Sequence, residues 1–216
     1  MKQAIADAGD APRGTSVWTE GTLQLLDDTL DSLLAGLGLA IIAIFLMLSA
    51  YYQSFKVPLI ILSVLPAVIA GALLILFLTG STLNLQSYMG IIMSLGVSVS
   101  NAVLLINQAE YFRKQVGLSP ANAARMAASS RLRPVLMTAA AMLAGMLPMA
   151  IGIGDGAEQI APLGRAVIGG LIASTFSILL LLPHFFSALL AKSSTADPSL
   201  DPDDIASPYF QKQIQS

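Results

Sequence analysis

Four polar side chains lie inside a stretch of the sequence that is otherwise apolar enough to cross a membrane. The segment GVSVSNAVLLIN, residues 96–107, carries Ser98, Ser100, Asn101 and Asn107. Hydroxyl and amide groups donate and accept hydrogen bonds, and leaving them unsatisfied in hydrocarbon costs several kcal/mol. Such side chains therefore either hold helices together or line a path for a polar species.

Groups that could titrate or form a covalent intermediate are scarce around these residues. Between Ser32 and Ala109 the only ionisable side chain other than tyrosine is Lys56. The whole sequence has one histidine and no cysteine, so it offers neither an imidazole cluster nor thiolates for a metal. No nucleophile–base pair is recognisable either. We therefore expect no enzyme, no metal site and no cofactor.

The composition is typical of a membrane protein. Of the 216 residues, 55% are hydrophobic and 11% are charged, whereas about 25% of the residues of a soluble domain are charged. The net charge of -2 gives no basic surface for phosphates, so we expect no nucleic-acid partner. The lipid bilayer is the predicted surroundings of most of the chain.

Five stretches are long enough to cross that bilayer. A helix of about 20 apolar residues spans the hydrocarbon and satisfies its own backbone. The predicted spans are residues 33–52, 57–79, 87–108, 134–153 and 165–190. Ser119 and Pro120 can begin a further, amphipathic helix, which we expect on the membrane surface. The predicted fold class is an all-α membrane protein with five transmembrane helices in a bundle plus an amphipathic surface helix.

Basic residues fall mostly on one side of these spans. That side receives Lys56, Arg113, Lys114, Arg125, Arg131, Arg133, Lys192 and the distal Lys212, whereas Lys2, Arg13 and Arg165 fall on the other. Loops rich in lysine and arginine stay in the cytoplasm. The odd number of spans then places the N-terminus outside and the C-terminus in the cytoplasm.

The two ends of the chain differ from the spans. Residues 1–32 are predicted to hold a short strand around residues 15–19 and a helix that enters the membrane, which together would end an external domain. Residues 33–191 form the predicted five-span bundle. Residues 192–216 are rich in Pro, Ser and Asp, so we expect a disordered cytoplasmic tail.

The polar residues of the third span can be interpreted in two ways. A ridge of small residues recurs every four positions and would allow close helix packing; it consists of Gly90, Ser94, Ser98 and Ala102. Ser100, Asn101 and Asn107 lie off this ridge or at its margin. For these three, packing and a place beside a polar path both remain open.

Long segments of the sequence resemble one family of transporters. The segment GVSVSNAVLLI, residues 96–106, is followed after a basic link by SRLRPVLMTAAAMLAGMLPMAIGIGDGAEQIAPLGRAVIGGLIASTFSILLLLP, residues 130–183. Both resemble the carboxy-terminal membrane half of resistance-nodulation-division (RND) efflux permeases. Residues 49–96 are similar to the eighth and ninth spans of that family and the start of the tenth. The resemblance covers almost the whole chain and implies spans eight to twelve.

The resemblance also implies a function and partners. RND permeases are proton-driven pumps of the Gram-negative inner membrane, which work as homotrimers with a periplasmic adaptor and an outer-membrane channel. This chain would be the C-terminal half of the transmembrane domain, with residues 1–32 ending a periplasmic domain. It would be incomplete for transport without the aspartate-bearing membrane half and the periplasmic domains. The alternatives are a separately made, non-transporting protein that regulates or assembles with a full-length permease, and a degenerate remnant.

Residue roles carry over in part. In drug-exporting members a proton relay pairs two aspartates of the fourth span with a lysine of the tenth, assisted by an arginine and a threonine around the eleventh. The arginine matches Arg131, the threonine matches Thr138, and Ser100 occupies the lysine position. Metal exporters tend to place a carboxylate there, so the resemblance does not favour that branch.

Ser100, Asn101, Arg131 and Thr138 are thus implied as proton-relay support rather than as titrating groups. Two of them have plainer alternatives. Arg131 could be a cytoplasmic anchor beside Arg133, and the Thr138 hydroxyl could bond only its own helix.

Overall fold

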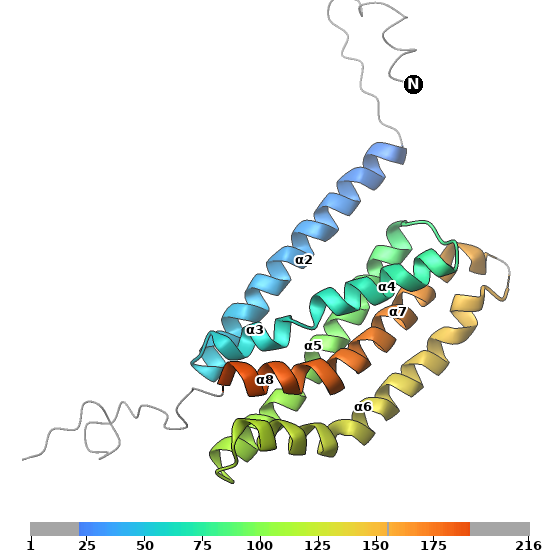
Figure 1. Ribbon diagram of the computed structural model, residues 1–216. Helices are drawn as coiled ribbons and strands as arrows, with labels where there is room; N and C mark the ends of the chain where they lie inside the picture. The colour runs from blue at the N-terminus through green and yellow to red at the C-terminus, as the bar shows by residue number, and fades with distance from the viewer. Residues whose placement is uncertain (1–21, 155, 191–216) are drawn as a thin grey trace, which may run out of the picture. The chain divides into compact units, whose positions relative to one another are not determined.

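The computed structural model describes residues 22–154 and 156–190, with side chains from residue 28 onward (Figure 1). Every regular element within these ranges is a helix: α2 (Thr22–Tyr52), α3 (Lys56–Leu62), α4 (Leu65–Leu78), α5 (Leu85–Lys114), α6 (Pro120–Ile151), α7 (Ala157–Phe176), the π-helical segment η1 (Ser177–Leu181) and α8 (Leu182–Leu190). The predicted all-α fold is confirmed. The predicted strand near residues 15–19 and the tail lie outside the described residues.

The helices supply five stretches long and apolar enough to cross a membrane. These are Asp28–Tyr52, Lys56–Leu78, Leu85–Lys114, Pro120–Ile151 and Ala157–Leu190. They correspond to the five predicted spans, but all except the second are longer. The last begins at Ala157 instead of residue 165, because Gly156 takes a left-handed conformation (φ 77) that ends the preceding loop.

The sequence predicted one helix for the second span, but the structure has two, α3 and α4. Pro66 lies in the first turn of α4 and has no N–H to donate to a carbonyl one turn earlier, so the helix is interrupted there. At the break, the Ser63 hydroxyl donates to the Ile60 carbonyl at 2.6 Å. The backbone N–H of Val64 reaches the Ile61 carbonyl at 3.4 Å. The junction therefore keeps its polar groups paired without a continuous helix.

The predicted surface helix and the fourth span are parts of a single helix, α6. Its start is as the sequence indicated: Pro120 is in the first turn and the Ser119 hydroxyl accepts from the Asn122 backbone N–H. Pro134 lies within the helix. Figure 1 shows α6 changing direction between its green first part and its yellow remainder. A proline inside a helix is a usual cause of such a bend.

The last span contains η1 because Pro183 follows it closely. Proline has no N–H, and its ring clashes with the carbonyl four residues earlier in a regular α-helix. In η1 the helix widens, and the Leu182 N–H bonds to the Ser177 carbonyl, five residues back. This wider turn accommodates Pro183 as the second residue of α8.

The described residues divide into two units between Ala40 and Ile41. In the second unit α7 packs against α4, α5 and α6. Glycines allow this, because backbones can approach closely where no Cβ intervenes. They stand on both sides of the contacts: Gly71 with Gly169, Gly90 with the Leu163 carbonyl, Gly170 with Ser94, and Gly164 with Ala150.

Candidate functional site

The small-residue ridge of α5 lies inside the bundle. Gly90, Ser94, Ser98 and Ala102 are all buried. The Ser94 hydroxyl donates to the Ile91 carbonyl at 2.8 Å, and the Ser98 hydroxyl donates to the Ser94 carbonyl at 2.6 Å. Both hydroxyls are thus satisfied by their own helix, and the ridge meets α7 through Gly90 and Ser94.

Ser100 and Asn101 have different surroundings from the ridge. Ser100 is exposed and Asn101 is half-buried. Two residues at 100° each separate Ser100 from Ser98, so it projects from the opposite side of α5. Within the described part of the chain, neither side chain has a hydrogen-bond partner. Both therefore keep their full hydrogen-bonding capacity for groups outside this chain's described bundle.

Arg131 and Thr138 lie on α6, which packs against α5. The Arg131 guanidinium donates to Gln108 Oε1 at 3.4 Å, which joins α6 to the last turns of α5. Thr138 is exposed, and its hydroxyl donates to the Pro134 carbonyl at 2.8 Å. None of the hydrogen bonds among the described residues joins the four candidate relay residues to one another. They are distributed over two neighbouring helices.

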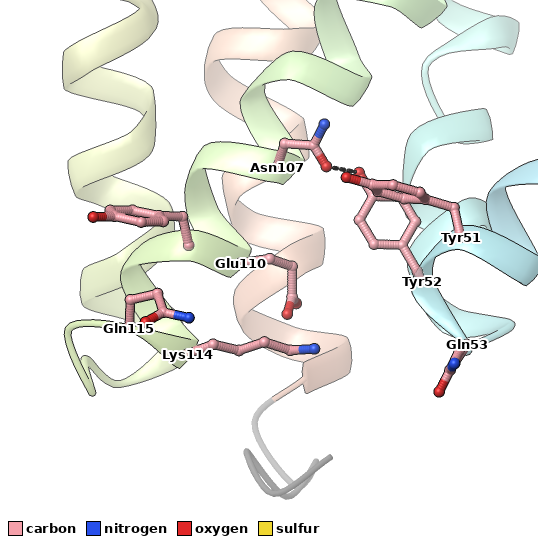
Figure 2. Close-up of a pocket in the computed structure, with 8 residues that line it drawn as sticks. Tyr51, Tyr52, Gln53, Asn107, Glu110, Lys114 and Gln115 are labelled. Atoms are coloured by element: carbon pink, nitrogen blue, oxygen red, sulfur yellow. Dashed lines mark hydrogen bonds between the residues drawn. The ribbon is translucent and has the colours of Figure 1, made fainter. Parts of the chain in front are cut away.

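A pocket of about 670 Å³ lies where α2 ends beside α5 (Figure 2). It is lined by Tyr51, Tyr52, Gln53, Asn107, Glu110, Tyr111, Lys114 and Gln115. Figure 2 shows the Asn107 amide oxygen turned toward Tyr52, whose hydroxyl donates to it at 2.5 Å. Asn107 was recognisable from the sequence as a polar residue in a span. Its partner on another helix was not.

Charged side chains gather at the same end of α5. Arg113 is 4% exposed, and its guanidinium lies 3.6 Å from Glu110 Oε1, one helical turn away. Such a separation is typical of pairs that stabilise a helix end. Across the described ranges no three His, Asp or Glu side chains come together as a metal site.

Arg165 forms a clamp at the opposite end of the bundle. From the sequence this residue was recognisable only as one positive charge on the less basic side of the spans. Its Nε donates to the Ala150 carbonyl at 2.9 Å, and one of its terminal nitrogens donates to the Ser81 hydroxyl at 2.7 Å. The half-buried Arg165 side chain, on α7, thus binds the end of α6 and the loop between α4 and α5. One cation thus joins two helices and a loop.

Five apolar helical stretches, a buried ridge and polar side chains on the outer faces of α5 and α6 define a multi-pass membrane protein. The family model of AcrB/AcrD/AcrF matches residues 1–190. The chain therefore belongs to the AcrB/AcrD/AcrF family of RND efflux permeases, as its resemblance indicated. This is a family of transporters and not of enzymes.

The structure is also similar to a solved one, described as the X-ray crystal structure of a heavy metal efflux pump. The two are 31% identical in sequence and superpose with a TM-score of 0.69. The match covers 87% of this chain and 18% of that chain. Less than a fifth of that pump thus corresponds to the residues described above, all of them membrane helices and their links.

Proposed function

We propose that these residues form spans eight to twelve, the C-terminal half of the transmembrane domain, of a proton-driven RND efflux permease. The observation that carries the proposal is the pair of exposed polar side chains Ser100 and Thr138 on the contacting helices α5 and α6. A face with polar groups at membrane depth suits a protein neighbour better than lipid. In this family that neighbour is the aspartate-bearing half of the transmembrane domain.

In the proposed complete permease, Ser100 and Asn101 support the proton relay without titrating. Their hydroxyl and amide groups would order water beside the aspartates of the neighbouring half or hydrogen-bond to their carboxylates. Arg131 would add a fixed positive charge, and Thr138 a second hydroxyl. Proton binding itself belongs to the aspartates, because the described spans hold no carboxylate at mid-membrane depth.

The proposed setting is the bacterial inner membrane. Residues 1–32 would lie in the periplasm and end a periplasmic domain, and residues 192–216 would lie in the cytoplasm. The basic side of the spans, with Lys56, Arg113 and Arg131 among its members, supports this orientation. Spans eight to twelve would work only with the remaining spans and periplasmic domains, as a homotrimer bound to an adaptor and an outer-membrane channel.

Substitution of Asn101 by leucine in the complete permease tests the relay proposal. Leucine keeps the volume but removes both hydrogen-bonding groups, and one such bond in a membrane contributes about 0.6 to 2 kcal/mol. Proton-coupled efflux from reconstituted vesicles should therefore fall several-fold, while trimer assembly, followed by size-exclusion chromatography, stays unchanged.

Ser98→Ala is the matched control on the same helix. Ser98 is buried on the ridge and bonded to its own backbone, so its loss should leave efflux near the unmodified level. Normal transport by the Asn101→Leu permease would refute the relay role and leave helix packing as the function of Asn101.

A further inference from the structure

A second pocket, of about 350 Å³, lies between the first turns of α6 and the end of the last span. It is lined by Ala121, Ala124, Arg125, Ala128, Leu179, Leu180, Pro183, His184 and Ser187. The three alanines of α6 have short side chains, which leave the pocket unfilled although α6 and α8 pack against each other. Arg125 from one helix and His184 from the other are its strongest hydrogen-bonding groups.

The two groups offer complementary chemistry. The Arg125 guanidinium carries a permanent positive charge and a planar fork of N–H donors suited to a phosphate. His184 Nδ1 lies 2.6 Å from the Leu180 carbonyl oxygen. Because a carbonyl only accepts, Nδ1 carries the hydrogen, and Nε2 of the neutral ring is an acceptor. The pocket therefore presents a cation for an anionic group and an acceptor for a hydroxyl.

The five-span topology places the pocket near one surface of the bilayer. The start of α6 and the end of α8 are on the same side of the membrane, since α6 and the α7–α8 span each cross it once in opposite directions. The last span has exposed apolar side chains at this end: Leu180, which lines the pocket, is 59% exposed, and Phe185 and Leu189 further along α8 are 43% and 47% exposed. A ligand with a polar head and hydrocarbon chains matches this arrangement.

We propose that this pocket binds the headgroup of an anionic phospholipid with a hydroxylated head, of the phosphatidylglycerol class. The lipid phosphate would pair with Arg125, a glycerol hydroxyl would donate to His184 Nε2, and the acyl chains would lie along Leu180 and its apolar neighbours. The volume suits a headgroup, because pockets for small molecules begin at about 300 Å³.

Lipid retention by the purified protein tests the site. The protein is placed in nanodiscs with equal amounts of phosphatidylglycerol and phosphatidylcholine, and native mass spectrometry measures the lipids that stay bound. The unmodified protein should retain phosphatidylglycerol several-fold in excess, and Arg125→Ala should abolish the excess. Arg133→Ala, which removes an exposed arginine of α6 outside the pocket, should not. Equal retention of both lipids, or an unchanged excess in Arg125→Ala, would overturn the proposal.

Two further measurements separate headgroup recognition from plain charge and from misfolding. His184→Ala should weaken retention of phosphatidylglycerol but not of phosphatidylmethanol, whose head has no hydroxyl; equal weakening of both would refute the hydroxyl contact. Arg125→Lys keeps the charge and, with an unchanged circular dichroism spectrum, should retain an intermediate excess; a full excess would refute the contact between the guanidinium fork and the phosphate. If inorganic phosphate displaces the lipid at an affinity equal to that of phosphatidylglycerol, the pocket is a free-anion site and the lipid assignment fails.

Discussion

Replacing Gly169 with alanine is expected to destabilise the bundle by about 1 to 3 kcal/mol, the usual cost of an added methylene in a packed core. A Cβ at this position would collide with the backbone carbonyl oxygen of Gly71 on α4 and lie 2.9 Å from Ile75 Cβ. A backbone oxygen cannot rotate away, so α4 and α7 would have to separate. Unfolding in sodium dodecyl sulfate, followed by circular dichroism, measures the loss of stability.

Gly96 supplies the matched control. It lies in α5, and a Cβ there would meet nothing within 4 Å. Alanine is the better helix former by about 0.8 to 1 kcal/mol in a helix interior, so Gly96→Ala should be neutral or stabilising. The same chemical change is therefore expected to have opposite effects at two helical glycines. Equal effects at both positions would mean that close backbone approach does not determine the stability of the bundle.

Arg165→Met is expected to produce the second large effect. Methionine keeps much of the side-chain volume but removes the donors to the Ala150 carbonyl and the Ser81 hydroxyl. A hydrogen bond from a charged group contributes about 1.5 to 3 kcal/mol when buried, and partial exposure places this pair at the lower end. The expected loss is about 2 kcal/mol in the same unfolding assay. Hydrogen exchange should also accelerate at the end of α6.

Ser81→Ala separates the two contacts of the clamp. It removes the hydroxyl acceptor and leaves the bond between Arg165 and the Ala150 carbonyl intact, so the loss should be less than half of that in Arg165→Met. Arg165→Lys keeps the charge but cannot reach both acceptors with the fixed geometry of a guanidinium. A fully stable lysine variant would show that charge alone suffices and that the two-armed contact is dispensable.

Much of the fold could be predicted because hydropathy and helix boundaries are local properties. The five spans follow from apolar length, and the start of α6 from the pairing of Ser119 with Pro120. The break before α4 was also present in the sequence as Pro66, but a continuous apolar run concealed it. Continuity across Pro134 was missed for the opposite reason, since proline usually marks a helix boundary and packing can maintain the helix past it.

The site was less predictable because its contacts join residues far apart in the chain. Helical periodicity places side chains on a face but does not say which helix that face meets. Tyr52 and Asn107 are 55 residues apart, and Arg165 and Ser81 are 84 apart. In each pair, the sequence around one residue does not identify the residue that it contacts. The glycine contacts of α7 could not be predicted for the same reason, because the sequence does not show whether a glycine contacts another helix backbone or lipid.

The π-helical segment η1 determines where the last span can lose one residue. A row of buried residues is spaced by four positions from α7 to α8: Gly170, Ser174, Ile178, Leu182, Phe186 and Leu190. At 3.6 residues per turn each step advances by about 40°, so the row would drift around a regular helix, and the extra residue of η1 turns it back. Loss of a single codon in this segment would leave the hydropathy of the span almost unchanged. It would also close the wide turn to a regular α-helix, in which Leu182, Phe186 and Leu190 still face the bundle, whereas loss of a codon in α7 or α8 would rotate the residues beyond it by about 100°. In-frame deletions of one codon should therefore be tolerated within η1 and damaging in the helices on either side of it.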